Sequence, residues 1–130
     1  MKPALDNPLL QDLGITVAEW RPGLCEMQLD VAPRHLNRRG RVQGGVAATL
    51  LDAVCGYAGL LQPGQAEPGE AATITLTVSY IGKLAQGRLR AVGRVTGSGR
   101  SIYFASGELF AADGSLAATA QGSFKRATGS

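Results

Sequence analysis

The stretch QGGVAATLLDAVCGYAGLL, residues 43–61, decides the fold, because it is the one long helical pattern in the chain. With about 100° between successive residues, one half of this helix is apolar and comprises Val46, Ala47, Leu50, Leu51, Val54, Cys55, Ala58 and Leu61. A face of this kind packs on a sheet. The other half carries small or short side chains, namely Gly45, Ala48, Thr49, Asp52, Gly56 and Gly59.

The small-residue face predicts a close neighbour. Each glycine inside a helix costs about 1 kcal/mol relative to alanine, so Gly56 and Gly59 need a compensating contact. We expect a second helix to approach them, and since the chain has one long helix, the second comes from another copy. A two-fold homodimer is the expected assembly; the alternative is a helix that merely tolerates glycine.

The residues around this helix predict a short helix and a set of strands. Asn7, Pro8 and Gly14 have the cap, first-turn and stop positions of a short N-terminal helix. Apolar and polar residues alternate elsewhere, as in half-buried strands, over residues 15–21, 24–31, 72–81, 87–96, 101–112 and 115–125. Turns are expected at Arg21-Pro22-Gly23, Gly97-Ser98-Gly99 and Asp113-Gly114. The order predicts an α+β fold with a mainly antiparallel sheet and one helix across it.

Composition restricts the function classes. The 130 residues include 13 basic and 10 acidic side chains and are 45% hydrophobic, which suits one soluble domain, residues 1–126, with a disordered tail at 127–130. Without a signal-peptide pattern or a stretch that spans a bilayer, we expect a cytoplasmic protein with no membrane partner. Cys25 and Cys55 lack metal-site spacing and are expected to be buried, reduced thiols. A single histidine, His35, leaves no histidine-rich zinc site, so no metal is expected.

The long helix carries two groups that could take part in a reaction. Gly44 and Gly45 begin it, where unpaired N–H groups and the helix dipole stabilise negative charge. Asp52 follows about 12 Å along the axis, too far to share a reacting atom with them. If two helices cross antiparallel near Ala48, each Asp52 approaches the partner's Gly44, an arrangement that suits attack of water on a polarised carbonyl. The alternative is that Asp52 is a structural hydrogen-bonding residue at the interface.

The basic residues are concentrated in two stretches. Four arginines, at 34, 38, 39 and 41, precede the long helix, and residues 71–107 contain five basic residues and no acid. This distribution predicts a phosphate-bearing partner. The chain has few aromatic residues for stacking on bases, so a phosphorylated small-molecule carrier fits better than nucleic acid. For Arg88 and Arg90 a solvated strand face is an equal alternative.

The stretch HLNRRGRVQGGVAATLLDAVCGYA, residues 35–58, resembles the PaaI-like branch of the hotdog-fold 4-hydroxybenzoyl-CoA thioesterase superfamily. The motif of that branch runs H-x-N-x-x-G-x-x-H-G-G, with an acidic residue two turns into the helix. The likeness extends over nearly the whole chain, including the early Asn-Pro helix and the final Asp-Gly hairpin. It implies a hotdog fold, in which a mainly antiparallel sheet of five or six strands wraps the long helix, in dimers that commonly pair into tetramers.

The resemblance also implies roles for individual residues. Asp52 matches the acid that acts as general base or nucleophile on an acyl-CoA thioester. Gly44 matches the residue whose N–H polarises the carbonyl, and Asn37 the residue that orients substrate or water from the opposite subunit. Coenzyme A is part of the substrate, so no separate cofactor is expected. The remaining substrate-binding candidates are His35, Gln43, Gly45, Tyr57 and Thr73, with Arg39, Arg41, Arg94 and Arg100 for the phosphates of coenzyme A.

Two positions depart from the pattern. Gln43 stands where the family often has histidine, and glutamine cannot exchange protons near neutral pH. Thr73 matches a hydroxyl residue that holds water in some relatives. The alternation, however, puts Ile74, Leu76, Val78 and Tyr80 toward the core and Thr73 away from it, unless the strand begins with a bulge.

Three functions remain open at this point. The first is an acyl-CoA thioesterase whose pocket, lined by Val54, Tyr57, Leu60 and Leu61, accepts aryl or medium-chain acyl groups. The second is a non-catalytic acyl-CoA-binding or regulatory hotdog protein, against which the acid at position 52 argues. The third is a hydratase or dehydratase, for which His35 is the only histidine and has the spacing of the thioesterase motif instead.

Overall fold

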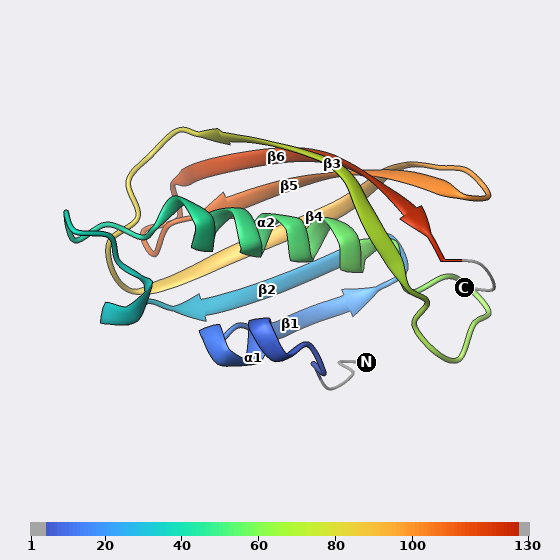
Figure 1. Ribbon diagram of the computed structural model, residues 1–130, viewed down its shortest axis with the longest axis horizontal. Helices are drawn as coiled ribbons and strands as arrows, with labels where there is room; N and C mark the ends of the chain where they lie inside the picture. Colours follow the sequence, from blue (N-terminus) through green and yellow to red (C-terminus); the bar gives the residue numbers. More distant parts are fainter. Residues whose placement is uncertain (1–4, 128–130) are drawn as a thin grey trace.

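Six antiparallel strands form one sheet that curves around a long helix (Figure 1). The computed structural model describes residues 5–127, so three of the four residues of the expected tail, 128–130, lie outside the described part. The strand order is β1-β2-β4-β5-β6-β3. In chain order the elements are α1 (Pro8–Leu13), β1 (Thr16–Arg21), β2 (Leu24–Asp30), a 3-10 turn (Pro33–His35), α2 (Gly44–Ala58), β3 (Ala71–Tyr80), β4 (Arg88–Ser98), β5 (Ile102–Phe110) and β6 (Leu116–Arg126). This arrangement confirms the predicted hotdog fold.

The predicted ends of the short helix and the last hairpin are confirmed. Asn7 Oδ1 accepts a hydrogen bond of 3.2 Å from the N–H of Leu10, and Gly14 ends α1 in the left-handed region with φ 83°. Gly114 has φ 89° in the turn between β5 and β6. The turn predicted at residues 97–99 joins β4 and β5 but lies further along the chain, at residues 99–101, because β4 continues to Ser98 beyond a bulge between Val95 and Gly97. The long helix is also shorter than predicted, since it ends at Ala58.

Glycines in the sheet bring α2 close to the strands. A Cβ at Gly93 of β4 would overlap the carbonyl of Val54, and one at Gly107 of β5 would lie 2.9 Å from Cys55 Sγ. Both contacts are with the apolar face of α2, which is buried as predicted. Part of the high glycine content therefore serves contact between the helix and its own sheet.

Gly56 and Gly59 also make room for neighbouring groups of the same chain. The expectation that a second helix approaches them is therefore wrong. A Cβ at Gly59 would overlap the ring of Tyr103, and one at Gly56 would lie 3.4 Å from Phe124. At Gly45, by contrast, no atom lies within 4 Å of the position of a Cβ. The part of the small-residue face that stays open is therefore the N-terminal half of α2.

β3 contains the bulge on which the orientation of Thr73 depends. Thr73 pairs with Phe124 and Thr75 pairs with Ser123, so Ile74 is an extra residue between them. The extra residue reverses the alternation, and Ile74 is 51% exposed. The expectation that Ile74 faces the core and Thr73 faces away is therefore wrong, whereas Leu76 and Val78 pack against the core as predicted.

Candidate active site

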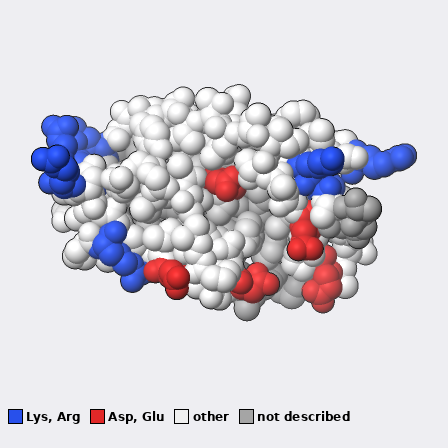
Figure 2. All heavy atoms as spheres, viewed as in Figure 1, with Lys and Arg blue, Asp and Glu red and all other residues white. Residues whose placement is uncertain are grey.

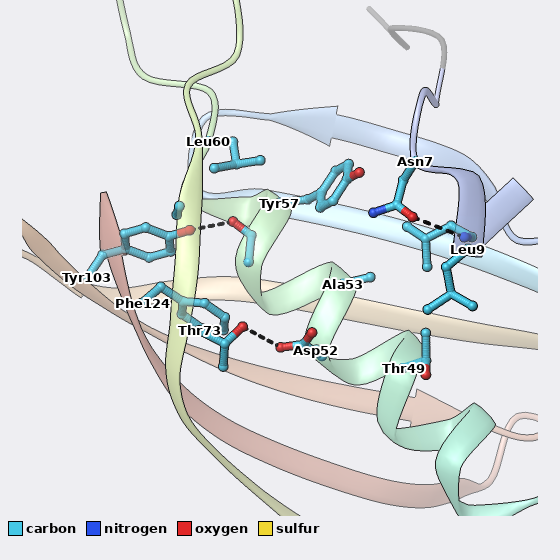
Figure 3. A pocket seen from close by; sticks show the side chains of 13 residues that line it. Asn7, Leu9, Thr49, Asp52, Ala53, Tyr57, Leu60, Thr73, Tyr103 and Phe124 are labelled. Carbon is cyan, nitrogen blue, oxygen red and sulfur yellow. Dashed lines mark hydrogen bonds between the residues drawn. The ribbon is translucent and has the colours of Figure 1, made fainter. Parts of the chain in front are cut away.

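Asp52 and Thr73 meet across the gap between α2 and β3. Thr73 Oγ1 donates a hydrogen bond of 2.8 Å to Asp52 Oδ1 (Figure 3). The bulge at Ile74 makes this contact possible, because it turns the Thr73 side chain toward the helix. Among the described residues, no donor contacts the second carboxylate oxygen of Asp52. The acid is thus held at one oxygen and available at the other.

Asp52 lies in the wall of a cavity of about 200 Å³ whose lining is partly apolar and partly polar. Five elements of the same chain, α1, α2, β3, β5 and β6, contribute to it (Figure 3). Its lining residues are Asn7, Leu9, Leu10, Thr49, Asp52, Ala53, Gly56, Tyr57, Leu60, Ala71, Thr73, Tyr103 and Phe124. Tyr57 and Leu60 were predicted to line the pocket and do so. Val54 does not, because it is fully buried against the sheet, and Leu61 is not part of this wall.

Tyr103 and Phe124 form a rigid aromatic part of this wall. Their rings stack with centroids 5.2 Å apart, and Tyr103 donates a hydrogen bond of 2.6 Å to the carbonyl of Gly56. Arg126 lies over the Tyr103 ring at 4.4 Å and donates to the carbonyl of Gly59 at the C-terminal end of α2. Burial raises the pKa of Tyr103 to about 12, although the charge of Arg126 acts in the opposite direction. The phenol is therefore neutral near pH 7.

Tyr57 and Asn7 form a polar pair at the other side of the cavity (Figure 3). The backbone carbonyl of Tyr57 accepts a hydrogen bond of 2.8 Å from the indole N–H of Trp20, and the two rings lie 5.1 Å apart. Burial raises the pKa of the Tyr57 hydroxyl, and a hydrogen bond with the Asn7 side chain partly offsets this. Asn7 thus caps α1 and contacts Tyr57, a second role that its capping position in the sequence did not reveal.

The start of α2 presents the N–H groups that the sequence pointed to. Among the described residues, neither the Gly44 N–H nor the Gly45 N–H has an acceptor. Tyr80 Oη donates a hydrogen bond of 2.7 Å to the carbonyl of Gly44, which holds this turn against β3. Gln43 is the exposed N-cap residue, and its side chain makes no capping hydrogen bond.

Asn37 lies at this same end of α2. Its Oδ1 accepts hydrogen bonds from the backbone N–H groups of Arg39 at 2.8 Å and Arg41 at 3.2 Å. A second cavity of about 200 Å³ is lined by Asn37, Arg39, Arg41, Val42, Ala47, Tyr80, Gly82, Lys83 and Leu84. One chain therefore carries two separate groups of candidate residues. Asn37, Arg39, Arg41 and Gly44 are at the start of α2. Asp52, with its partner Thr73, is about 12 Å further along the helix axis, and Tyr57 is about 20 Å from Gly44.

His35 ties its loop to the short helix. It is 1% exposed, its Nδ1 accepts a hydrogen bond of 2.9 Å from the N–H of Ala32, and its Nε2 donates to the carbonyl of Leu13 at 2.7 Å in the tautomer that these partners require. It lines neither of the two cavities. This position gives the side chain a structural role in the loop.

The candidate arginines do not form one patch within a chain. The loop with Arg39 and Arg41 lies at one end of the long axis, and the β4–β5 turn with Arg100 lies at the other (Figure 1). Arg94 is exposed on β4. Arg88 pairs with Asp30 at 2.8 Å and lowers the pKa of that carboxyl, and Arg90 lies 3.4 Å from Glu26. Cross-strand pairing with acids of β2 thus accounts for these two residues.

The middle and upper part of the face that carries α2 are largely uncharged. Figure 2 shows lysine and arginine side chains mainly toward the two ends of this face, and one acidic spot near its centre. Residues 5–127 contain no group of three or more His, Cys, Asp or Glu side chains that could hold a metal ion. No helix in the same range is long and apolar enough to cross a membrane.

Comparison with known proteins identifies the family. Residues 39–118, which include α2, the strands β3, β4 and β5 and the start of β6, match the family model of the thioesterase superfamily. No curated protein sequence matches the chain.

Solved structures share the fold over nearly the whole length. A conserved protein of Pseudomonas aeruginosa is 26% identical, with a TM-score of 0.85 over 96% of this chain and 100% of that one. Zebrafish thioesterase superfamily member 2 is 25% identical, with a TM-score of 0.79 over 94% and 89%. The PaaI protein of the Escherichia coli phenylacetic acid degradation operon is 20% identical, with a TM-score of 0.83 over 94% and 86%. The chain therefore belongs to the thioesterase superfamily, has the hotdog fold and is a thioester hydrolase.

Proposed function

We propose that the protein hydrolyses an acyl-CoA thioester to the free acid and coenzyme A, with Asp52 as the catalytic acid–base residue. The observation that carries this proposal is the position of Asp52 in the wall of a cavity that apolar and polar side chains line together. One oxygen of its carboxylate is held by Thr73, and the other has no partner among the described residues. A positioned carboxylate with a free oxygen can accept a proton from water.

The reaction proceeds in two steps. Asp52 takes a proton from a water molecule as the water oxygen bonds to the thioester carbon, and the carbonyl oxygen becomes an oxyanion. The Gly44 N–H stabilises this oxyanion. The tetrahedral intermediate then expels the thiolate of coenzyme A, which takes the proton from Asp52, and the carboxylic acid is released. Direct attack by Asp52 is the alternative, and hydroxylamine would trap the acyl anhydride that such an attack forms.

Gly44 and Asp52 of one chain are too far apart for this chemistry, so the proposed site is shared between two chains. Antiparallel crossing of two α2 helices near Ala48 would bring the partner's Gly44 to each Asp52. The open N-terminal half of α2, with space around Gly45, supports such an approach, as does the uncharged face in Figure 2. The free edge of β3 adds two exposed apolar side chains, Tyr80 and Ile81, to this side. Pairing of two dimers into a homotetramer stays a prediction.

The lining of the cavity supports an aryl or medium-chain acyl group. Its walls are mainly aliphatic and aromatic, with Leu9, Leu60 and Phe124 among them. In the crossed dimer the Arg39 and Arg41 loop of one chain would lie on the coenzyme A side of the other chain's Asp52. Three cationic side chains, Arg39, Arg41 and Lys83, line the second cavity, at the start of α2, and could bind the phosphates of coenzyme A.

A panel of aryl- and acyl-CoA thioesters, followed by release of free thiol, tests the proposal. We expect turnover of aryl and medium-chain substrates by wild type and a loss of at least about 100-fold in kcat for Asp52→Asn and Asp52→Ala. Glu108→Gln, which neutralises an exposed acid on β5, is the matched control. Wild-type activity in Asp52→Asn would remove this residue from the mechanism. Tight binding of coenzyme A without turnover of any substrate would favour the non-catalytic binding protein instead.

A further inference from the structure

A larger cavity adjoins the one beside Asp52. It has a volume of about 500 Å³. The two cavities have four wall residues in common, Asn7, Tyr57, Leu60 and Ala71. Tyr57 follows Asp52 by five residues, so it lies about 7 Å further along α2, and Leu60 comes just after the end of the helix at Ala58. An acyl group that extends from Asp52 toward the C-terminal end of the same α2 helix would therefore reach the larger cavity.

The wall of the larger cavity carries negative charge. Asp6, Glu67 and Glu70 are among its lining residues, and none of its described lining residues is lysine or arginine. Figure 2 shows acidic side chains along the lower side of the face, toward the loop that follows α2. The loop with Arg38, Arg39 and Arg41 lies at the opposite end of α2. Within one chain, the acidic wall and this basic loop thus lie at opposite ends of α2.

Two basic residues, Lys125 and Arg126, lie close to this cavity but are not among its described lining residues. Lys125 and Arg126 line a separate cavity that shares Glu70 and Ala71 with the acidic one. Arg126 donates to the carbonyl of Gly59 and to Ser98 Oγ and covers the ring of Tyr103. Glu70 lines both cavities and so lies near these two cations. The negative charge of the larger cavity therefore depends mainly on Asp6 and Glu67.

We propose that the two cavities form one acyl path, and that Asp6 and Glu67 at its far end select against acyl groups with a negative charge remote from the thioester. This inference rests on the proposed acyl-CoA hydrolysis and names its substrate class. The preferred acyl group is uncharged or carries a cationic or hydroxyl group at the far end, where the Tyr57 hydroxyl and the Asn7 carboxamide offer hydrogen bonds. A dicarboxylic acyl group is rejected by repulsion of like charges.

The expected selectivity is moderate, because Asp6 and Glu67 are exposed to solvent. At physiological salt, charges interact over about 8 Å through water. Two such carboxylates near a bound carboxylate lower kcat/KM by about tenfold. The effect should shrink as the salt concentration rises.

Three substrates of equal chain length test the inference: octanoyl-CoA, the mono-CoA thioester of octanedioic acid, and 8-aminooctanoyl-CoA. Any charge that moves from water into the path loses part of its hydration, so the comparison of the carboxylate with the ammonium substrate isolates the sign of the charge. We expect kcat/KM of wild type to be about tenfold higher for the ammonium substrate. Molar salt should reduce this ratio toward one.

Asp6→Asn with Glu67→Gln should reduce the ammonium-to-carboxylate ratio at low salt, mainly through faster hydrolysis of the dicarboxylic substrate. Glu108→Gln is the matched control and should leave the ratio unchanged, because Glu108 lies on β5 and lines neither cavity. An equal kcat/KM for the two charged substrates in wild type, or a ratio that the double variant does not change, would overturn the inference while hydrolysis of octanoyl-CoA still supports the proposed function. No hydrolysis of any acyl-CoA would overturn both.

Discussion

Thr73 Oγ1 donates a hydrogen bond of 2.8 Å to Oδ1 of Asp52 and thereby joins the edge strand β3 to the helix α2. The bond exists because Ile74 is an extra residue in β3, which turns Thr73 toward the helix. It fixes one oxygen of the proposed catalytic carboxylate and leaves the other facing the cavity. Thr73 is thus a positioning residue for Asp52.

Thr73→Val should therefore lower kcat by about tenfold, with a smaller change in KM, because it keeps the shape of the side chain and removes one hydrogen bond to a charged group. Thr73→Ser retains the hydroxyl and should restore most of the activity. Steady-state kinetics on one aryl-CoA substrate check both variants. Equal activity of the valine and serine variants would show that the hydroxyl does not position Asp52.

Gly59→Ala should destabilise the fold, because a Cβ at this position would overlap the ring of Tyr103. Overpacking of this kind costs about 1–3 kcal/mol. Gly97→Ala is the control, since a Cβ there would be in ordinary contact with Phe104, 3.6 Å away, and should change the free energy of unfolding by no more than about 1 kcal/mol. Urea denaturation measures both values. A fully stable Gly59→Ala variant would contradict the contact with Tyr103.

The thiols of Cys25 and Cys55 should not react with a disulfide reagent in the folded protein. Both are free and buried, and burial raises the pKa of each to about 12. The pKa of each thiol is higher in the folded protein than in the unfolded chain, so the folded state is favoured at neutral pH, where both thiols are neutral. This contribution to stability declines as the pH rises from about 9 toward 12. We expect no reaction at pH 8 until urea unfolds the chain, and rapid labelling of the native protein would contradict the buried positions.

Gly44→Pro should remove the proposed oxyanion donor while keeping the helix. Proline suits the first position of a helix, and Gln43, with φ −57° and ψ 136°, already has the backbone conformation favoured before proline. We expect kcat to fall by about 100- to 1000-fold. Gly44→Ala retains the N–H and adds a Cβ in ordinary contact with Tyr80, so it should retain most of the activity. A similar kcat for the proline and alanine variants would exclude the Gly44 N–H as the donor.

Local signals in the sequence predicted most of the fold. Asn7, Pro8 and Gly14 mark α1, and Asp113-Gly114 marks the last hairpin, since caps and turns depend on neighbouring residues. The bulge at Ile74 could not be placed from the sequence, because alternation alone does not show which residue is left unpaired.

Longer-range contacts explain what the sequence could not show in the site. Gly56 and Gly59 accommodate the rings of Phe124 and Tyr103, from strands far along the chain, and a wheel of one helix cannot contain these partners. The same holds for the cavity wall, where the rings of Tyr103 and Phe124 meet α2. The position of Asp52 on α2 followed from the sequence, but its contact with Thr73 did not.

The central claim is that each active site combines Asp52 of one chain with Gly44 of another, and mixed dimers of two inactive variants test it most directly. Asp52→Asn and Gly44→Pro are each expected to be nearly inactive alone. When the two are refolded together, half of the dimers contain one chain of each kind, and each mixed dimer has one intact site, so about one quarter of wild-type activity should return. No recovery in a mixture that light scattering and mass spectrometry show to contain mixed dimers would contradict the shared site.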